Sequence, residues 1–256
     1  VLWYLQISLI PRNFMQKARK ALSESTASTP MIYYHSQTPG DLEATLAHGV
    51  SLTCGKLLLM RHSVRPPFPP GVFHFQVDLT PEGVRLAEAL GTRLGTQLIS
   101  LDSSTSSRCL QTAEAIGRGS GQPVPVRANP KLGDKGVFVQ DSDRNHQYMV
   151  EQGPLGLVNA GLRGDSDCGL NPVRAATQEL LQDLWKEGLP EGTYRVAVTH
   201  DTMLSLILGA LSGRQALDEE DWPKMLEGAL LWVEEDRLCW CWRGKLYGQP
   251  RQEWLG

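Results

Sequence analysis

The sequence predicts an α/β protein with a three-layer αβα arrangement, in which helices cover both faces of a mostly parallel central sheet. Short apolar runs typical of buried strands lie at 56–60 and 194–200. They alternate with segments of helical periodicity at 79–98, 108–117, 171–188 and 202–211. This alternation is typical of parallel strands joined by helices. The 256 residues are also enough to bury a core without disulfides or a metal ion.

Composition and charge exclude several classes of protein. The chain has 41% hydrophobic and 21% charged residues and a net charge of −3, so it is globular and offers no general attraction to nucleic acid. No apolar run reaches the length of a membrane span, and we expect no transmembrane segment. The five cysteines are scattered and odd in number, which argues against a disulfide framework and a zinc cage. No metal or cofactor is expected.

The N-terminal part has a different character from the rest. Residues 1–55 form an extension of uncertain structure, and an orderly pattern begins only at Lys56. Residues 1–40 carry a net charge of +3 and many Ser and Thr residues, so export or organelle targeting stays open. The unpaired cysteines favour the cytoplasm.

The first half of the predicted domain, 56–256, begins with the strand 56–60, which ends directly at Arg61 and His62. A Pro-rich loop follows at 65–71. The helix 79–98 has Thr80 as its N-cap and Pro81 at its first position.

The second half continues with the helix 108–117, which has Arg108 in its first turn, and a short strand at 124–126. Residues 128–170 lack periodicity, and we expect a small loop-rich cap insertion over roughly 128–190. Within it, Asn171 would cap the helix 171–188. The strand 194–200, the helix 202–211 and a hairpin over 229–242 complete the domain.

Two pairs of polar residues follow predicted strands. Arg61-His62 and His200-Asp201 each stand where a strand ends, and ligands bind beyond the carboxyl ends of parallel strands. A phosphate monoester needs guanidinium groups to hold its dianion, a nucleophile and a proton for the leaving oxygen. The chain offers candidates for every part: Arg61, His62, Arg65, Arg108, His200 and Asp201.

The chemistry assigns these residues distinct parts. His62 would attack as neutral imidazole, because surrounding arginines disfavour the imidazolium and depress its pKa. Arg108 lies near the positive end of a helix dipole, a favourable place for an anion. Asp201 is the natural proton donor, since an acid close to a bound dianion resists ionisation; it also suits the N-cap of the next helix.

Several motifs resemble the histidine phosphatase superfamily, and more narrowly its acid phosphatase and phytase branch. RHSVRPP at 61–67 is similar to the family's Arg-His-Gly-x-Arg-x-Pro signature, and THDTML at 199–204 matches the late His-Asp motif. LTPEG at 79–83 and SSTSSRCLQTAEAI at 103–116 agree in order and spacing, and EGALLW at 227–232 agrees more loosely. The resemblance implies a phosphoglycerate mutase-like fold with a reduced cap.

The resemblance also implies residue roles. By it, His62 is the nucleophile and Asp201 the proton donor, while the phosphate is clamped by Arg61, Arg65, Arg108 and His200. Ser63 departs from the family's usual Gly, and its hydroxyl would either bond the ligand or crowd it.

Three hypotheses about function follow. The first is a metal-independent phosphomonoester hydrolase that acts on a small-molecule ester through a phosphohistidine on His62. The second is a phosphotransferase of the phosphoglycerate mutase type. Members of that type take their proton from a mid-chain glutamate, so the His200-Asp201 pair favours the hydrolase. The third is a catalytically impaired phosphate-binding or scaffold protein, supported only by Ser63.

Overall fold

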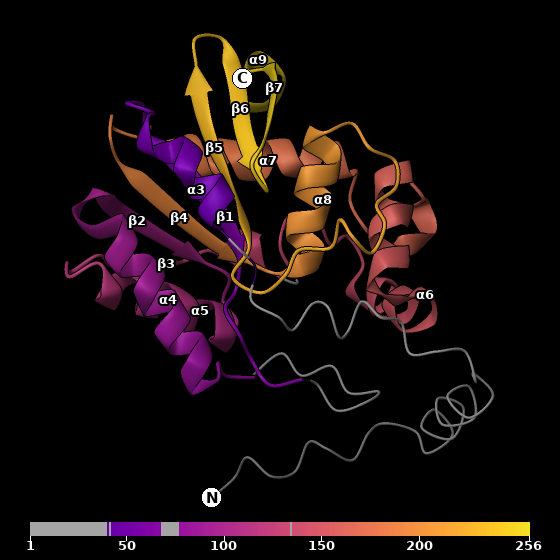
Figure 1. Ribbon diagram of the computed structural model, residues 1–256. Helices are drawn as coiled ribbons and strands as arrows, with labels where there is room; N and C mark the ends of the chain where they lie inside the picture. The colour runs from indigo at the N-terminus through magenta and orange to yellow at the C-terminus, as the bar shows by residue number, and fades with distance from the viewer. Residues whose placement is uncertain (1–39, 41, 68–76, 134) are drawn as a thin grey trace, which may run out of the picture. The chain divides into compact units, whose positions relative to one another are not determined.

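One mixed sheet forms the centre of the computed structural model, which describes residues 40, 42–67, 77–133 and 135–256 (Figure 1). The described residues form seven strands in the order β3-β2-β4-β1-β5-β6-β7. Their bounds are β1 Lys56–Arg61, β2 Leu98–Ser103, β3 Val126–Ala128, β4 Tyr194–Thr199, β5 Gly228–Glu234, β6 Arg237–Trp242 and β7 Lys245–Pro250. The predicted α/β fold is confirmed.

Parallel and antiparallel pairings divide the sheet into two halves. Strand β4 pairs in parallel with both β1 and β2, and β2 pairs in parallel with β3. Strands β5, β6 and β7 extend the sheet from β1 by antiparallel pairing. The carboxyl ends of β1, β2 and β4 therefore meet at one edge.

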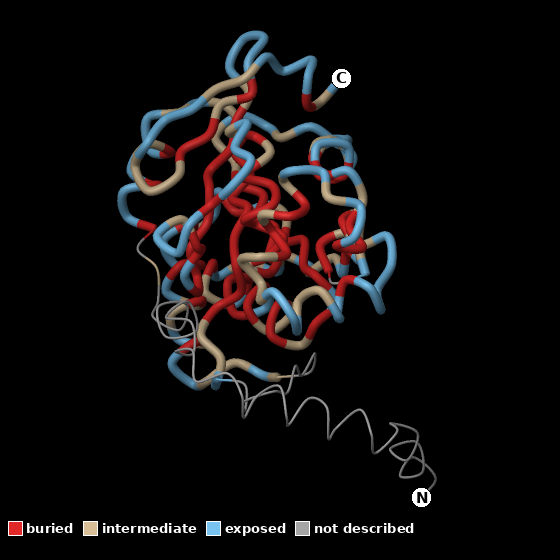
Figure 2. Tube along the Cα trace, turned by 90° about the vertical axis from the view of Figure 1, so that its right-hand side faces the viewer, coloured by how far each residue is buried: buried red, intermediate tan, exposed pale blue. Residues whose placement is uncertain are grey.

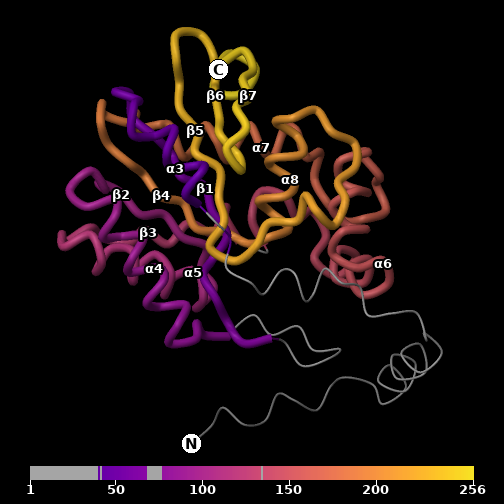
Figure 3. The backbone as a smooth tube through the Cα atoms, in the orientation of Figure 1, coloured from indigo at the N-terminus to yellow at the C-terminus, as the bar shows by residue number. Residues whose placement is uncertain are grey.

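Helices cover both faces of the sheet, which gives the three layers (Figures 1 and 3). One face carries α3 (Glu43–Val50), α4 (Pro81–Leu94) and α5 (Ser107–Gly119). The other carries α7 (Val173–Trp185) and α8 (Asp201–Leu211), with α6 (Ser142–Arg163) packed against α8 and α9 (Gln252–Leu255) against α7.

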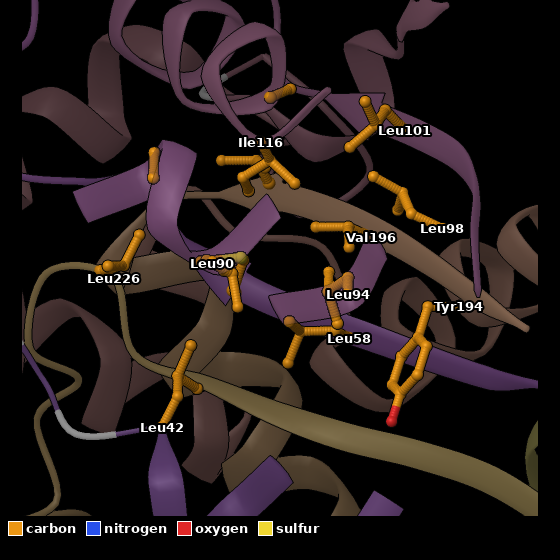
Figure 4. Close-up of a cluster of buried hydrophobic side chains, with 14 of the residues drawn as sticks. Leu42, Leu58, Leu90, Leu94, Leu98, Leu101, Ile116, Tyr194, Val196 and Leu226 are labelled. Atoms are coloured by element: carbon orange, nitrogen blue, oxygen red, sulfur yellow. The ribbon is translucent and has the colours of Figure 1, made fainter. Parts of the chain in front are cut away.

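Alternation along the strands decides which side chains enter which layer. Leu58 and Met60 of β1 join Val196 and Val198 of β4 in a buried cluster with α4 and α5 (Figure 4). Leu57 and Leu59 alternate with them and are also fully buried. Because β1 and β4 are covered on both sides, the buried residues concentrate along the sheet (Figure 2).

Helix α4 begins as its sequence predicts and ends earlier. Thr80 is the N-cap and its side chain accepts a hydrogen bond from the Gly83 N–H. The helix ends at Leu94 because Gly95 turns the backbone to φ 51°, and a short 3₁₀ turn leads to Leu98. Leu98 therefore opens β2, a strand that the sequence analysis did not identify.

The segment predicted to be loop-rich differs most from expectation. Residues 142–163 form α6, whose regularity is interrupted at Gly153 (φ 73°) and Pro154. This break obscures the helical periodicity in the sequence. Helix α7 begins at Val173 with Pro172 at the N-cap position, one residue later than predicted. The Asn171 side chain instead donates to the Val137 carbonyl.

The two ends of the domain also hold unexpected elements. Helix α3 lies within the predicted extension, and the neighbouring Leu42 and its own Leu46 are buried in the core. Residues 1–39 of the extension and 68–71 of the Pro-rich loop lie outside the described residues. At the other end, the β5–β6 hairpin is confirmed, and β7 adds an edge strand that was not predicted.

Other features can be stated for the described part of the chain. None of its helices is both long and apolar enough to cross a membrane. All five cysteines are free thiols. Within the same residues, no group of three or more His, Cys, Asp and Glu side chains is arranged to hold a metal ion.

Helices α4 and α5 approach each other through glycines, which yields a test of the packing. A Cβ on Gly91 would lie 2.0 Å from the Ile116 carbonyl oxygen, and one on Gly119 would lie 1.9 Å from the Glu88 carbonyl oxygen. On an open helix surface, Gly→Ala stabilises by about 1 kcal/mol. We predict that Gly91→Ala instead destabilises the protein by about 1–3 kcal/mol in urea unfolding, because the helices must separate. The reciprocal Ala89→Gly at an exposed α4 position calibrates helix propensity alone. Stabilisation by Gly91→Ala would contradict the close approach.

Candidate active site

The carboxyl ends of β1, β2 and β4 bring the predicted polar residues together. Arg61 pairs with Thr199, and Ser103 pairs with Val198. The next residue of each strand, His62, Ser104 or His200, therefore emerges at the same edge. Sequence reasoning predicted this convergence for β1 and β4 and missed the contribution of β2.

His62 is held by its backbone and its ring. Its N–H donates to the Thr199 carbonyl at 3.0 Å, and its carbonyl accepts from the Leu226 N–H at 3.0 Å. The ring nitrogen Nδ1 lies 2.8 Å from the Ser63 carbonyl oxygen. A carbonyl can only accept, so Nδ1 carries the proton and Nε2 carries the lone pair. The nucleophilic atom of a neutral imidazole is therefore fixed as Nε2.

Burial and charge keep this ring neutral. His62 is only 2% exposed, and desolvation is the largest cause that lowers its pKa well below the ordinary value of 6.5. The positive charges of Arg61, Arg108 and His200 lower the pKa further, against a smaller opposing effect of the Ser63 hydrogen bond. The predicted depression of the His62 pKa is confirmed in direction.

His200 lies beside His62 in a fixed orientation. The two ring centroids are 5.9 Å apart at an interplanar angle of 69°. Arg108 donates from Nη2 to Nδ1 of His200 at 2.9 Å, so Nδ1 is the acceptor and the His200 proton lies on Nε2. Nε2 donates to the Ser104 hydroxyl at 2.9 Å. This chain of hydrogen bonds connects β4, the start of α5 and the end of β2.

Arg61 is anchored from two sides. Its Nη1 donates to the Pro223 carbonyl at 2.8 Å, and its Nη2 pairs with Asp201 Oδ2 at 2.7 Å. The Arg61 side chain is only 1% exposed, whereas that of Asp201 is 26% exposed. The ion pair thus has a buried guanidinium and a carboxylate that solvent can reach.

Asp201 is the first residue of α8, next to the N-cap position of His200. Its Oδ1 accepts a hydrogen bond from the Thr202 N–H at 2.9 Å. Burial favours the neutral acid, but the charges of Arg61 and Arg65 are among the causes that outweigh it and lower the Asp201 pKa below its ordinary value. Asp201 is therefore a carboxylate before any anion binds.

Arg65 and Arg108 complete the positive cluster. Nη1 of Arg65 donates to the Pro66 carbonyl at 2.8 Å, and the charge of Arg65 acts on Asp201. Arg108 lies in the first turn of α5, where it is buried and acts on both histidines. Guanidinium groups and a helix N-terminus suit an oxyanion.

Ser63 ties the segment after His62 to two helices. Its hydroxyl donates to the Gly83 carbonyl at 2.7 Å, and its N–H donates to the Thr112 hydroxyl at 2.9 Å. The contact with α4 is close, since a Cβ on Gly83 would lie 2.1 Å from the Val64 carbonyl oxygen. The Ser63 proton is thus engaged within the fold.

Supporting residues were missed by sequence reasoning. Ser104 orients His200, Pro223 holds Arg61, and Thr112 links Ser63 to the Arg108 carbonyl at 2.7 Å. Thr112 had a detectable signal, because it lies four residues after Arg108 on the same helix face. The Pro223 contact uses a backbone carbonyl, which no side-chain pattern reveals.

The comparisons with known proteins agree on the family. Residues 57–155 match the family model described as histidine phosphatase superfamily (branch 1). The acid phosphatase and phytase branch inferred from the motifs is not confirmed by this match. No curated protein sequence matches the chain significantly.

Solved structures support the fold. A phosphoserine phosphatase from Entamoeba histolytica, in complex with phosphoserine, is 16% identical with a TM-score of 0.50 over 77% of this chain and 97% of that one. A phosphoglycerate mutase from Bacillus anthracis is 14% identical with a TM-score of 0.47, covering 79% and 94%. A mycobacterial glucosyl-3-phosphoglycerate phosphatase is 18% identical with a TM-score of 0.49, covering 77% and 97%.

The depressed pKa of His62 yields a test with a definite sign. We predict that His62 is neutral at pH 6.5 in the folded protein, since its pKa lies well below that value. Because the unfolded chain then binds more protons than the folded one, the His62 contribution to stability is complete above its unfolded pKa and is lost as the pH falls below about 6.5. Histidine ring chemical shifts in NMR, assigned with His62→Gln, check this prediction. A His62 titration midpoint near 6.5 would contradict the electrostatic description of the site.

Proposed function

Because the chain belongs to the histidine phosphatase superfamily, we propose that it is a phosphomonoester hydrolase in which His62 is transiently phosphorylated. The observation that carries this proposal is the His62 ring: a neutral imidazole with Nδ1 bound to the Ser63 carbonyl and Nε2 carrying the lone pair. A nucleophile in this protonation state needs no separate base to activate it.

The substrate is a small-molecule phosphate ester whose phosphoryl group lies among Arg61, Arg65, Arg108 and His200. Two observations support this placement: Arg108 contacts His200 directly, and the charges of Arg61 and Arg108 act on His62. Cations fixed before the substrate arrives stabilise the charge of the transferring phosphoryl group without reorganisation. The backbone and carboxylate contacts of Arg61 supply this fixation.

The first chemical step joins His62 Nε2 to phosphorus as the ester P–O bond breaks. The leaving oxygen takes its proton from the Asp201 carboxyl group, which becomes a carboxylate. Asp201 is ionised in the chain without ligand, so the step requires its pKa to rise when substrate binds. A phosphate dianion supplies this change, because its negative charge opposes ionisation of a nearby acid and competes for Arg61.

The second step regenerates the protein. Water attacks phosphorus, gives its proton to the Asp201 carboxylate, and the P–Nε2 bond breaks to release phosphate and neutral His62. The acid of the first step thus becomes the base of the second. Every proton is accounted for by Asp201, the leaving alcohol and water, and the two steps need no metal ion.

The nucleophile is tested by substitution. We expect His62→Ala to abolish hydrolysis of a nitrophenyl phosphate in the presence of a chelator, because no other described residue holds a neutral imidazole with this orientation. Phosphate binding, measured by calorimetry, should persist because Arg61 and Arg108 remain. Turnover by His62→Ala at the wild-type rate would overturn the proposal, and phosphoryl transfer to an added alcohol instead of water would establish a transferase.

The proton donor is tested by the leaving group. We predict that Asp201→Asn slows hydrolysis of alkyl phosphates by about a hundred- to ten-thousand-fold, whereas nitrophenyl phosphate is affected much less because its leaving group departs without a proton. The exposed Asp167→Asn is the matched control for loss of a carboxylate. Equal losses on both esters would remove Asp201 from the donor role.

A further inference from the structure

A second cavity lies outside the cluster of arginines and histidines. It has a volume of about 300 Å³ and opens between α8, the strands β6 and β7, and the segment after α8 (Figure 3). Its α8 residues, Ser205, Leu208 and Ser212, follow Asp201 at helical spacing along the same face. None of the residues that line it belongs to the proposed phosphate site.

Two buried polar atoms lining this cavity lack partners. The Ser205 hydroxyl and the Trp240 indole N–H belong to residues that are each 1% exposed, and neither atom has a hydrogen-bond partner among the described residues. Both residues line the cavity. An unsatisfied buried donor costs about 1–3 kcal/mol, so a bound molecule that supplies an acceptor to Trp240 and a partner to Ser205 gains affinity.

The walls define the chemistry of such a molecule. Trp240 and Tyr247 are stacked, with centroids 5.3 Å apart at 11°, and Trp242 carries the Arg243 guanidinium 4.8 Å from its ring centroid. Indole and phenol rings provide flat surfaces for the C–H faces of a saturated ring.

The polar rim is electrically balanced. Arg214 pairs with Asp221 at 2.6 Å, and both residues line the cavity. Because the charges cancel, the rim does not favour an anion, unlike the phosphate site. Asp221 can only accept hydrogen bonds, Arg214 can only donate them, and a hydroxyl group can satisfy either.

Size narrows the class further. At about 30 Å³ per water molecule, a cavity of this volume holds about ten waters, and so a ligand of roughly a dozen non-hydrogen atoms. We propose that the cavity between α8 and the β6–β7 hairpin binds a neutral, hydroxylated ring of monosaccharide size, with Ser205 and Trp240 as its buried hydrogen-bonding partners.

The experiment is calorimetric titration of the full chain with glucose, galactose and mannose, with adenosine as an aromatic comparison. We expect saturable binding of at least one sugar, weakened about tenfold in Ser205→Ala by the lost hydrogen bond. Trp242→Ala should abolish it by removing an aromatic wall. Binding should be unchanged in His62→Ala, which lies in the other site, so this result does not depend on the proposed hydrolysis.

A thermal melt of the same variant provides an independent check. Since the Ser205 hydroxyl has no partner among the described residues, Ser205→Ala should leave the Tm of the ligand-free protein unchanged or slightly raised. A lowered Tm would show that the hydroxyl serves the fold and would overturn the premise. Absence of sugar binding, or binding of adenosine alone, would overturn the proposal itself.

Discussion

Strand β1 pairs in parallel with β4, residue for residue, from Lys56 opposite Tyr194 to Arg61 opposite Thr199. Both strands are buried along their whole length, so this register is set by core packing on two faces. The pairing places His62 and His200 side by side, and a shift by one residue would send one of the two side chains to the opposite face of the sheet. The site therefore depends directly on the core of the protein.

The same electrostatic repulsion that burdens the fold prepares its chemistry. Arg61 and Arg108 are buried beside two histidines, an arrangement that costs stability unless it is offset by hydrogen bonds and ion pairs. Asp201 and the Pro223 carbonyl provide that offset for Arg61. The positive charge also drives His62 toward its neutral form, so a nucleophile and an anion-binding cluster arise from one interaction.

Strong local signals made much of the fold predictable. The apolar run before Arg61, the Thr80-Pro81 helix start and the β5–β6 hairpin each have a chemical cause in adjacent residues. Helix α6 was missed because Gly153 and Pro154 interrupt its periodicity. Strand β7 was missed because an exposed edge strand lacks a buried face that alternation would reveal.

The site shows the same division. The residues that provide charge and nucleophilicity could be found because their types and their places after strands carry information. The contacts that orient them could not, since the Ser63 carbonyl, the Pro223 carbonyl and the Ser104 hydroxyl act through positions that only the folded chain defines. The role of Ser63 illustrates this limit: its hydroxyl engages Gly83, a contact between residues 20 positions apart in sequence.

The most direct measurement of the central claim is the position of the phosphoryl group on His62. Rapid acid-free quenching during turnover, followed by ³¹P NMR or mass spectrometry of the isolated peptide, distinguishes the two ring nitrogens. Since Nδ1 donates to the Ser63 carbonyl, the account predicts phosphorylation at Nε2. Phosphate on Nδ1, or on any residue other than His62, would contradict it.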